Sequence, residues 1–74
     1  MAAGLILVVA AETALRDMVA FHLKGAGHRV LTAADGAEAL ASAARFAPEL
    51  VLAEATLPDM GGAQLCERLK QDAG

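Results

Sequence analysis

Three short apolar runs alternate with segments whose apolar residues recur at helical spacing. The runs are Leu5 to Val9 (LILVV), a weaker one centred on Val30 and Leu31, and Leu50 to Ala53 (LVLA). A continuous apolar run is typical of a strand buried on both faces, as in parallel sheets. Close alternation of such strands with helices predicts one α/β domain, residues 1–74, with the order β-α-β-α-β-α and a parallel sheet.

The helix boundaries follow from local signals. The first helix is expected from Thr13 to Lys24, because glycines follow it. Its apolar face is expected to comprise Leu15, Met18, Val19 and Leu23. The second helix is expected to start after Asp35, which forms a capping box with Glu38, and to end before Pro48. The apolar face of the last helix is expected to comprise Leu65, Cys66 and Leu69.

Composition excludes several classes of partner and site. Six Lys and Arg against nine Asp and Glu give a net charge of −3, and aromatic residues are 3% of the chain, so nucleic acid is not expected as a direct partner. Cys66 is the single cysteine, which excludes an internal disulfide and indicates a reducing compartment. The apolar start carries no Lys or Arg before Leu5 and is too short to span a bilayer. We therefore expect a cytoplasmic chain without a membrane partner.

Several phrases together resemble the receiver domain of two-component response regulators, which has a CheY-like, flavodoxin-like fold. They are ILVV, LRDM, GHRV, TAADGAEAL and PELVLAEATLPDMGG. The last is the most specific, because an acidic residue closes a buried strand and Leu-Pro-Asp-Met follows three residues later. The resemblance covers essentially the whole chain. It includes only the first three of the family's five βα units, so we expect a truncated receiver with a partial (β-α)3 sheet.

The resemblance also implies a phosphorylation site, and this chain departs from it. In the family, an aspartate ending the third strand accepts a phosphoryl group, with Mg²⁺ held by that aspartate, an acidic pair after the first strand, and a backbone carbonyl. The matching positions are Ala10 and Ala11 for the pair, Glu54 for the acceptor and Thr56 for the carbonyl. Mg²⁺ requires oxygen ligands. We therefore expect no metal site, no cofactor and no catalytic residue, and a phosphorylation-deficient or pseudo receiver that is not an enzyme.

Two acidic residues near these positions have alternative interpretations. Glu12 is a weak candidate for a substitute metal ligand, but an acidic residue in the first turn of a helix, favoured by the dipole, is the preferred interpretation. Glu54 either imitates a phosphorylated aspartate or is a solvated, idle carboxylate, and we favour the latter.

Three functions follow, from different classes. The first is a pseudo receiver acting through protein–protein interaction, with a sensor histidine kinase or an output domain as possible partners. The second is an active receiver that accepts phosphate on Glu54. The third is a purely structural half-domain that self-assembles. Natural degeneration and deliberate engineering would give the same pattern at the acidic positions.

The sheet edge predicts self-association. In the family's strand order, 2-1-3-4-5, this chain would end with Leu50 to Ala53 at an edge. Exposed apolar edges pair readily with another chain. We therefore expect a homodimer through the third strand that completes the sheet.

Overall fold

The structure, a computed structural model, describes residues 4–73 and, for residues 72 and 73, the backbone alone. Three strands alternate with three helices along the chain. In order they are β1 (Leu5–Val9), α1 (Thr13–Gly25), β2 (Arg29–Ala33), α2 (Gly36–Phe46), β3 (Leu50–Ala53) and α3 (Gly62–Ala73). The predicted element order is therefore confirmed.

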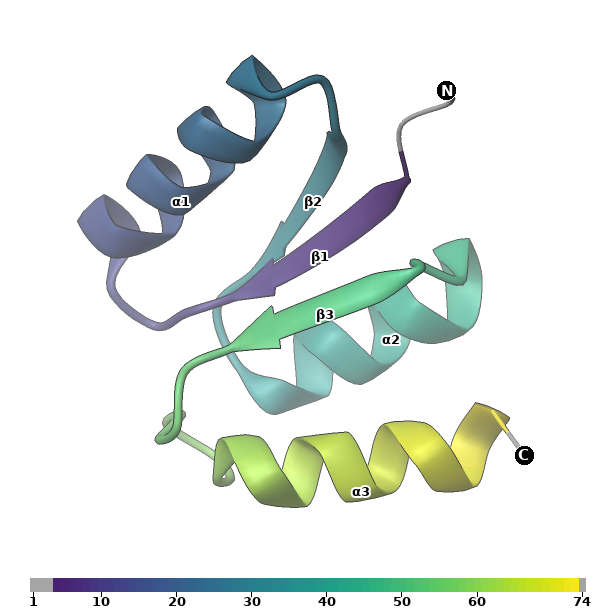
Figure 1. Cartoon of the computed structure of the whole chain (residues 1–74). Coiled ribbons are helices and arrows are strands. Elements are labelled where there is room, and N and C mark those ends of the chain that lie inside the picture. The colour runs from purple at the N-terminus through teal and green to yellow at the C-terminus, as the bar shows by residue number, and fades with distance from the viewer. Residues whose placement is uncertain (1–3, 74) are drawn as a thin grey trace.

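The strands form one parallel sheet in the order β2-β1-β3, with α1 on one face and α2 and α3 on the other (Figure 1). The register places Ile6 of β1 beside Val30 of β2 and Leu50 of β3. β1 is the central strand, and four of its five residues are buried. The LILVV run is therefore apolar throughout because both faces of β1 are covered.

The main core lies between the sheet and the helices α2 and α3. Its buried members are Leu7, Val9, Ala33, Ala39, Leu57 and Leu65. Small residues on the inner face of α2 bring that helix close to β1 and β2. Asp35 caps α2 as predicted, since Glu38 N–H donates to Asp35 Oδ1 over 2.8 Å. The Glu38 carboxylate reaches back as well, but it accepts from Ala34 N–H, one residue before the N-cap.

Two side chains predicted to be buried are exposed. Leu15, Val19 and Leu23 face the sheet beside buried Ala20, and this places Met18 on the opposite side of α1. On α3, Leu65 is buried, and Cys66 is turned away because each helical residue rotates by about 100°. Both predictions rested on hydrophobicity, which does not by itself decide which side of a helix faces the sheet.

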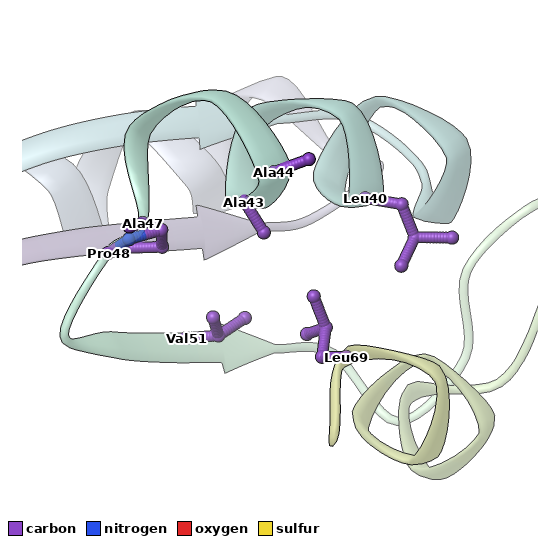
Figure 2. A pocket seen from close by; sticks show the side chains of 7 residues that line it. All are labelled: Leu40, Ala43, Ala44, Ala47, Pro48, Val51 and Leu69. Carbon is purple, nitrogen blue, oxygen red and sulfur yellow. The ribbon is translucent and has the colours of Figure 1, made fainter. Parts of the chain in front are cut away.

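β3 is poorly covered, as its expected edge position requires. Leu50 and Leu52 are 50% and 38% exposed, and the described residues 4–73 place no strand along the outer edge of β3. On the opposite face, an apolar hollow of about 550 Å³ separates α2, β3 and α3. Leu40 and Leu69 point toward each other across it, and Val51 lines it from the strand (Figure 2). Within the described residues, no helix is both long and apolar enough to cross a membrane.

Candidate functional site

The carboxyl ends of the three strands meet at one edge of the sheet, where α/β proteins commonly carry their functional groups. Backbone hydrogen bonds hold these ends together: Ala10 N–H donates to Ala33 O and Glu54 N–H donates to Val9 O, each over 3.0 Å. Ala10 is buried and Ala11 is exposed. The junction between β1 and α1 therefore presents methyl groups and backbone at the position of the family's acidic pair.

Glu54 is bound to this junction. Its Oε1 accepts a hydrogen bond from Ala11 N–H over 2.8 Å, and the residue is partly buried. Glu54 therefore has one backbone partner, and its interpretation as a solvated, idle carboxylate stays a prediction. The carboxylate links the loop after β3 to the loop after β1, because the longer glutamate side chain reaches a backbone amide across the strand ends.

Arg16, which the sequence analysis did not single out, lies at the same edge. Its Nη1 donates to Ala10 O over 2.8 Å, and its Nη2 donates to Thr13 Oγ1 over 3.4 Å. The guanidinium thus satisfies a carbonyl group at the start of α1. A positive charge follows β1 at the edge where the family carries a pair of negative charges.

Thr56 lies in a compact turn between β3 and α3. It bridges to Gly61 in antiparallel fashion, and Leu57 N–H donates to Met60 O over 2.9 Å. The turn closes where Gly62 N–H donates to Ala55 O over 2.8 Å. A Cβ at Gly62 would collide with the carbonyl oxygen of Glu54, so glycine is required there.

Asp59 fastens this turn to the start of α2. Its two carboxylate oxygens accept from Gly36 N–H over 2.8 Å and from Ala37 N–H over 2.9 Å. The hydrogen bond from Gly36 is the main reason that the pKa of Asp59 lies below its usual value, although desolvation opposes it. The side chain of Met60 packs where a Cβ at Gly36 would stand.

The sequence analysis missed the role of Asp59, which it used only as part of the phrase that resembles the family. The contact joins residues more than twenty positions apart, so no local pattern contains it. The available signal was the glycine at position 36, since a helix whose first residue lacks a side chain leaves room for another segment at its N-terminus.

The acidic residues near the strand ends do not gather into a cluster. Glu12 is the N-cap of α1 and its side chain makes no capping hydrogen bond. In the part of the chain that the structure describes, no group of three His, Cys, Asp or Glu side chains is arranged to hold a metal ion. The expectation that Ala10, Ala11, Glu54, Thr56 and Glu12 form no metal site stays a prediction.

Comparisons with known proteins identify the family. The family model described as "Response regulator receiver domain" matches residues 6–74. The regulatory protein PhoP of Bacillus subtilis is 36% identical over 66 residues, which are 89% of this chain and 28% of PhoP. TcrX of Mycobacterium tuberculosis is 37% identical, over 90% of this chain and 29% of its own length.

Solved structures agree with this match. The chemotaxis response regulator CheY4 of Vibrio cholerae superposes with a TM-score of 0.92 at 31% identity, covering 96% of this chain and 59% of CheY4. The receiver domain of the hybrid histidine kinase CckA gives a TM-score of 0.87 at 34% identity, covering 96% of this chain and 68% of that domain. The chain thus spans less than a third of these two curated relatives and about three fifths of CheY4. With its three βα units and CheY-like parallel sheet, the chain belongs to the response regulator receiver domain family.

Proposed function

We propose that this chain is a phosphorylation-deficient receiver module of a two-component response regulator, acting through protein–protein interaction. A receiver is a signalling module and not an enzyme. The observation that carries the proposal is the hydrogen bond from Ala11 N–H to Glu54 Oε1. Glu54 is at the family's acceptor position, and this bond occupies one of its carboxylate oxygens. The donor is the backbone of Ala11, which is at the position of an acidic ligand in the family.

The chemistry of phosphoryl transfer supports this proposal. The transferred group carries negative charge that a metal ion normally neutralises, and Mg²⁺ prefers near-octahedral oxygen ligands. Ala10 and Ala11 offer no side-chain oxygen, and Ala10 O already accepts from Arg16. The donor set therefore does not fit Mg²⁺, and we derive no step through the metal.

The second candidate function, phosphate acceptance by Glu54, retains one favourable observation. Glu54 is a partly exposed carboxylate at the carboxyl end of β3, where the resemblance places the acceptor. Its longer side chain directs the carboxylate to Ala11 N–H, so attack on a phosphodonor would require breaking that hydrogen bond.

Intact mass after incubation with acetyl phosphate and Mg²⁺ tests the two functions. We expect no added phosphoryl mass on the native chain. The matched control is Glu54→Gln, which keeps the size of the side chain and removes the acceptor carboxylate. A phosphoryl adduct present on the native chain and absent from Glu54→Gln would overturn the proposal in favour of acceptance by Glu54.

The proposed partners follow from the family and from the exposed sheet edge. We propose that the module works in the cytoplasm and contacts a histidine kinase or an output domain, as receiver domains generally do. We also propose a homodimer in which β3 of one copy meets β3 of a second copy. Exposed Leu50 and Leu52 and the uncovered outer edge of β3 support this. The purely structural half-domain would share this dimer but would bind no kinase.

A further inference from the structure

The side chain of Met60 lies over the first residue of α2. Its Sδ, Cγ and Cε atoms all come within 2.7 Å of the place where a Cβ at Gly36 would stand, so the thioether fills the space that the glycine leaves. Gly36 is buried, and Met60 packs against the main core while it remains partly exposed. Met60 is therefore a packed part of the fold that solvent can still reach.

Hydrogen bonds fasten the turn to α2 at the same place. The two carboxylate oxygens of Asp59 accept from Gly36 N–H over 2.8 Å and from Ala37 N–H over 2.9 Å. Within the turn, Met60 O accepts from the N–H of buried Leu57 over 2.9 Å. The turn is thus attached to α2 by two hydrogen bonds and by one thioether packed on a glycine.

Oxidation is the reaction that changes the polarity of a thioether most simply. When hydrogen peroxide is the oxidant, an S–O bond forms and the peroxide O–O bond breaks. The sulfur loses two electrons, and the second peroxide oxygen leaves as water after it takes up the proton of the transferred oxygen. The sulfoxide is larger and more polar than the thioether, and its oxygen accepts hydrogen bonds.

The surroundings of Met60 do not accommodate such an oxygen. The N–H groups of Gly36 and Ala37 already donate to Asp59. The sulfoxide oxygen must therefore displace Asp59 from these donors or move out of the space above Gly36, because an unpaired polar group is costly inside a packed contact. Either response breaks the attachment of the turn to α2.

We propose that Met60 is an oxidative modification site, at which conversion of the thioether to the sulfoxide detaches the turn after β3 from the start of α2. This turn directly follows Glu54, so the modification would loosen the segment next to the family's acceptor position. Methionine sulfoxide reductases reverse the reaction, which makes the change a reversible one. The proposal goes beyond the proposed function, because it requires neither a phosphodonor nor a second copy of the chain.

Met18 provides a reference methionine within the same chain. It is 52% exposed, on the side of α1 that faces away from the sheet. Peroxide should therefore oxidise Met18 at least as readily as Met60, with little effect on the fold. An effect of oxidation on stability can thus be assigned to one methionine by replacing each in turn.

The first experiment treats three 74-residue chains with hydrogen peroxide, all of them carrying Cys66→Ser because that thiol is exposed. One has no further change, the second carries Met18→Leu and the third Met60→Leu, which conserves volume. Peptide mass mapping locates the added oxygen. The thermal midpoint should fall by about 4–8 °C in the first two chains and stay unchanged in the third. Treatment with the reductases should restore it.

Amide hydrogen exchange tests the detachment itself and requires no substitution of Met60. Oxidation should speed exchange of the Gly36 and Ala37 amides by about tenfold or more, because their bonds to Asp59 are lost. The Ala10 amide, whose acceptor lies on β2, should exchange as before. Met60→Gln, which places a polar side chain of similar length over α2, should speed the same two amides without peroxide.

Three results would each overturn the proposal. The first is a chain in which Met60 carries the added oxygen while the Gly36 and Ala37 amides exchange at their former rates. The second is a Met60 that stays unmodified in the folded chain after Met18 has been oxidised. The third is a fall in the thermal midpoint that persists in Met60→Leu. None of them bears on the mass after acetyl phosphate treatment, so the two proposals fail separately.

Discussion

Carboxylates in this chain bind backbone N–H groups at the ends of elements. Asp35 caps α2, and Glu38 Oε1 accepts from Ala34 N–H over 2.9 Å. Asp59 and Glu54 accept amides from segments distant in sequence. Since these carboxylates accept from backbone donors that would otherwise be unpaired, we expect their removal to lower the stability of the fold.

Asp59 should make stability depend on pH. Its folded-state pKa is lowered, chiefly by the hydrogen bond from Gly36, so the unfolded chain binds its proton more readily. The stabilisation is therefore complete above the unfolded pKa of about 4 and is lost as the pH falls through the folded value. Asp59→Asn should lower the free energy of unfolding at pH 7, measured by urea denaturation.

The difference between the native chain and Asp59→Asn should then shrink as the pH is lowered from 5 toward 3, because the native carboxyl becomes protonated as well. Glu67→Asn, at an exposed carboxylate of α3, serves as the control for a general loss of negative charge. A difference that stayed constant across this range would show that the charge of Asp59 does not stabilise the contact.

Replacing Ala47, the C-cap of α2, with glycine is expected to stabilise the protein. Its φ of 47° is in the left-handed region, which costs a residue with a Cβ about 1 kcal/mol more than glycine. Ala47→Gly should therefore raise the free energy of unfolding by about 0.5–1 kcal/mol. Ala44→Gly, inside the same helix, should lower it by about 1 kcal/mol. If chemical denaturation showed that both substitutions change the free energy of unfolding in the same direction, the assigned C-cap geometry would be contradicted.

Restoring the acidic pair should lower stability in the absence of metal. Asp at positions 10 and 11 would place like charges near Glu54, and residue 10 is buried, so Ala10→Asp with Ala11→Asp should cost on the order of 1–3 kcal/mol. Millimolar Mg²⁺ should raise the thermal midpoint of this variant and leave that of the native chain unchanged. An upward shift in the native chain would reveal a metal site that its residues do not predict.

At the level of elements, local sequence signals predicted most of the fold. β1 and β3 have the predicted bounds, and α1 extends only one residue beyond the predicted end. These predictions succeeded because apolar runs, capping residues and glycines act locally. The end of α2 before Pro48 was predicted for the same reason.

What the sequence did not predict depends on contacts between elements. The bond between Glu54 and Ala11 requires the ends of β3 and β1 to be neighbours, and the attachment of Asp59 requires the turn to reach α2. Met18 shows the same dependence within a helix, because the packing of Leu15, Val19 and Leu23 on the sheet decides which side is exposed. The place of these residues at the strand ends was therefore predictable, and the hydrogen bonds made there were not.

At the scale of the whole molecule, β3 is the least covered part of the sheet. α3 packs mainly against α2, and Leu50 and Leu52 remain exposed on the α1 side of the sheet, because α1 covers mainly β1 and β2. Val51 packs on the main core from the other face. One face of β3, with Val51, thus packs on the core of the monomer. The other face, with Leu50 and Leu52, and the outer edge of the strand are what a second copy would cover.

If a second copy covers β3, folding and association should be coupled. The thermal midpoint of the 74-residue chain should then rise with protein concentration, since the dimer binds native chains only. Leu52→Lys should abolish this dependence and lower the midpoint, because a charge would enter the apolar contact. Val51→Lys should both dissociate the dimer and unfold the chain. Because Val51 also packs on the monomer core, Leu52→Lys is the clearer test of the dimer.

Thr32→Lys provides the matched control for that experiment. Thr32 and Leu52 lie in one row across the sheet, each paired with Val8, and Thr32 is exposed on the opposite edge strand. The same charge added there should change neither the mass nor its dependence on concentration, because β2 is not the proposed contact. Light scattering at micromolar concentration gives the mass. A folded monomer whose midpoint is unaffected by dilution would refute the β3 dimer, because β3 would then be stable with its outer edge and the Leu50 and Leu52 side chains in water.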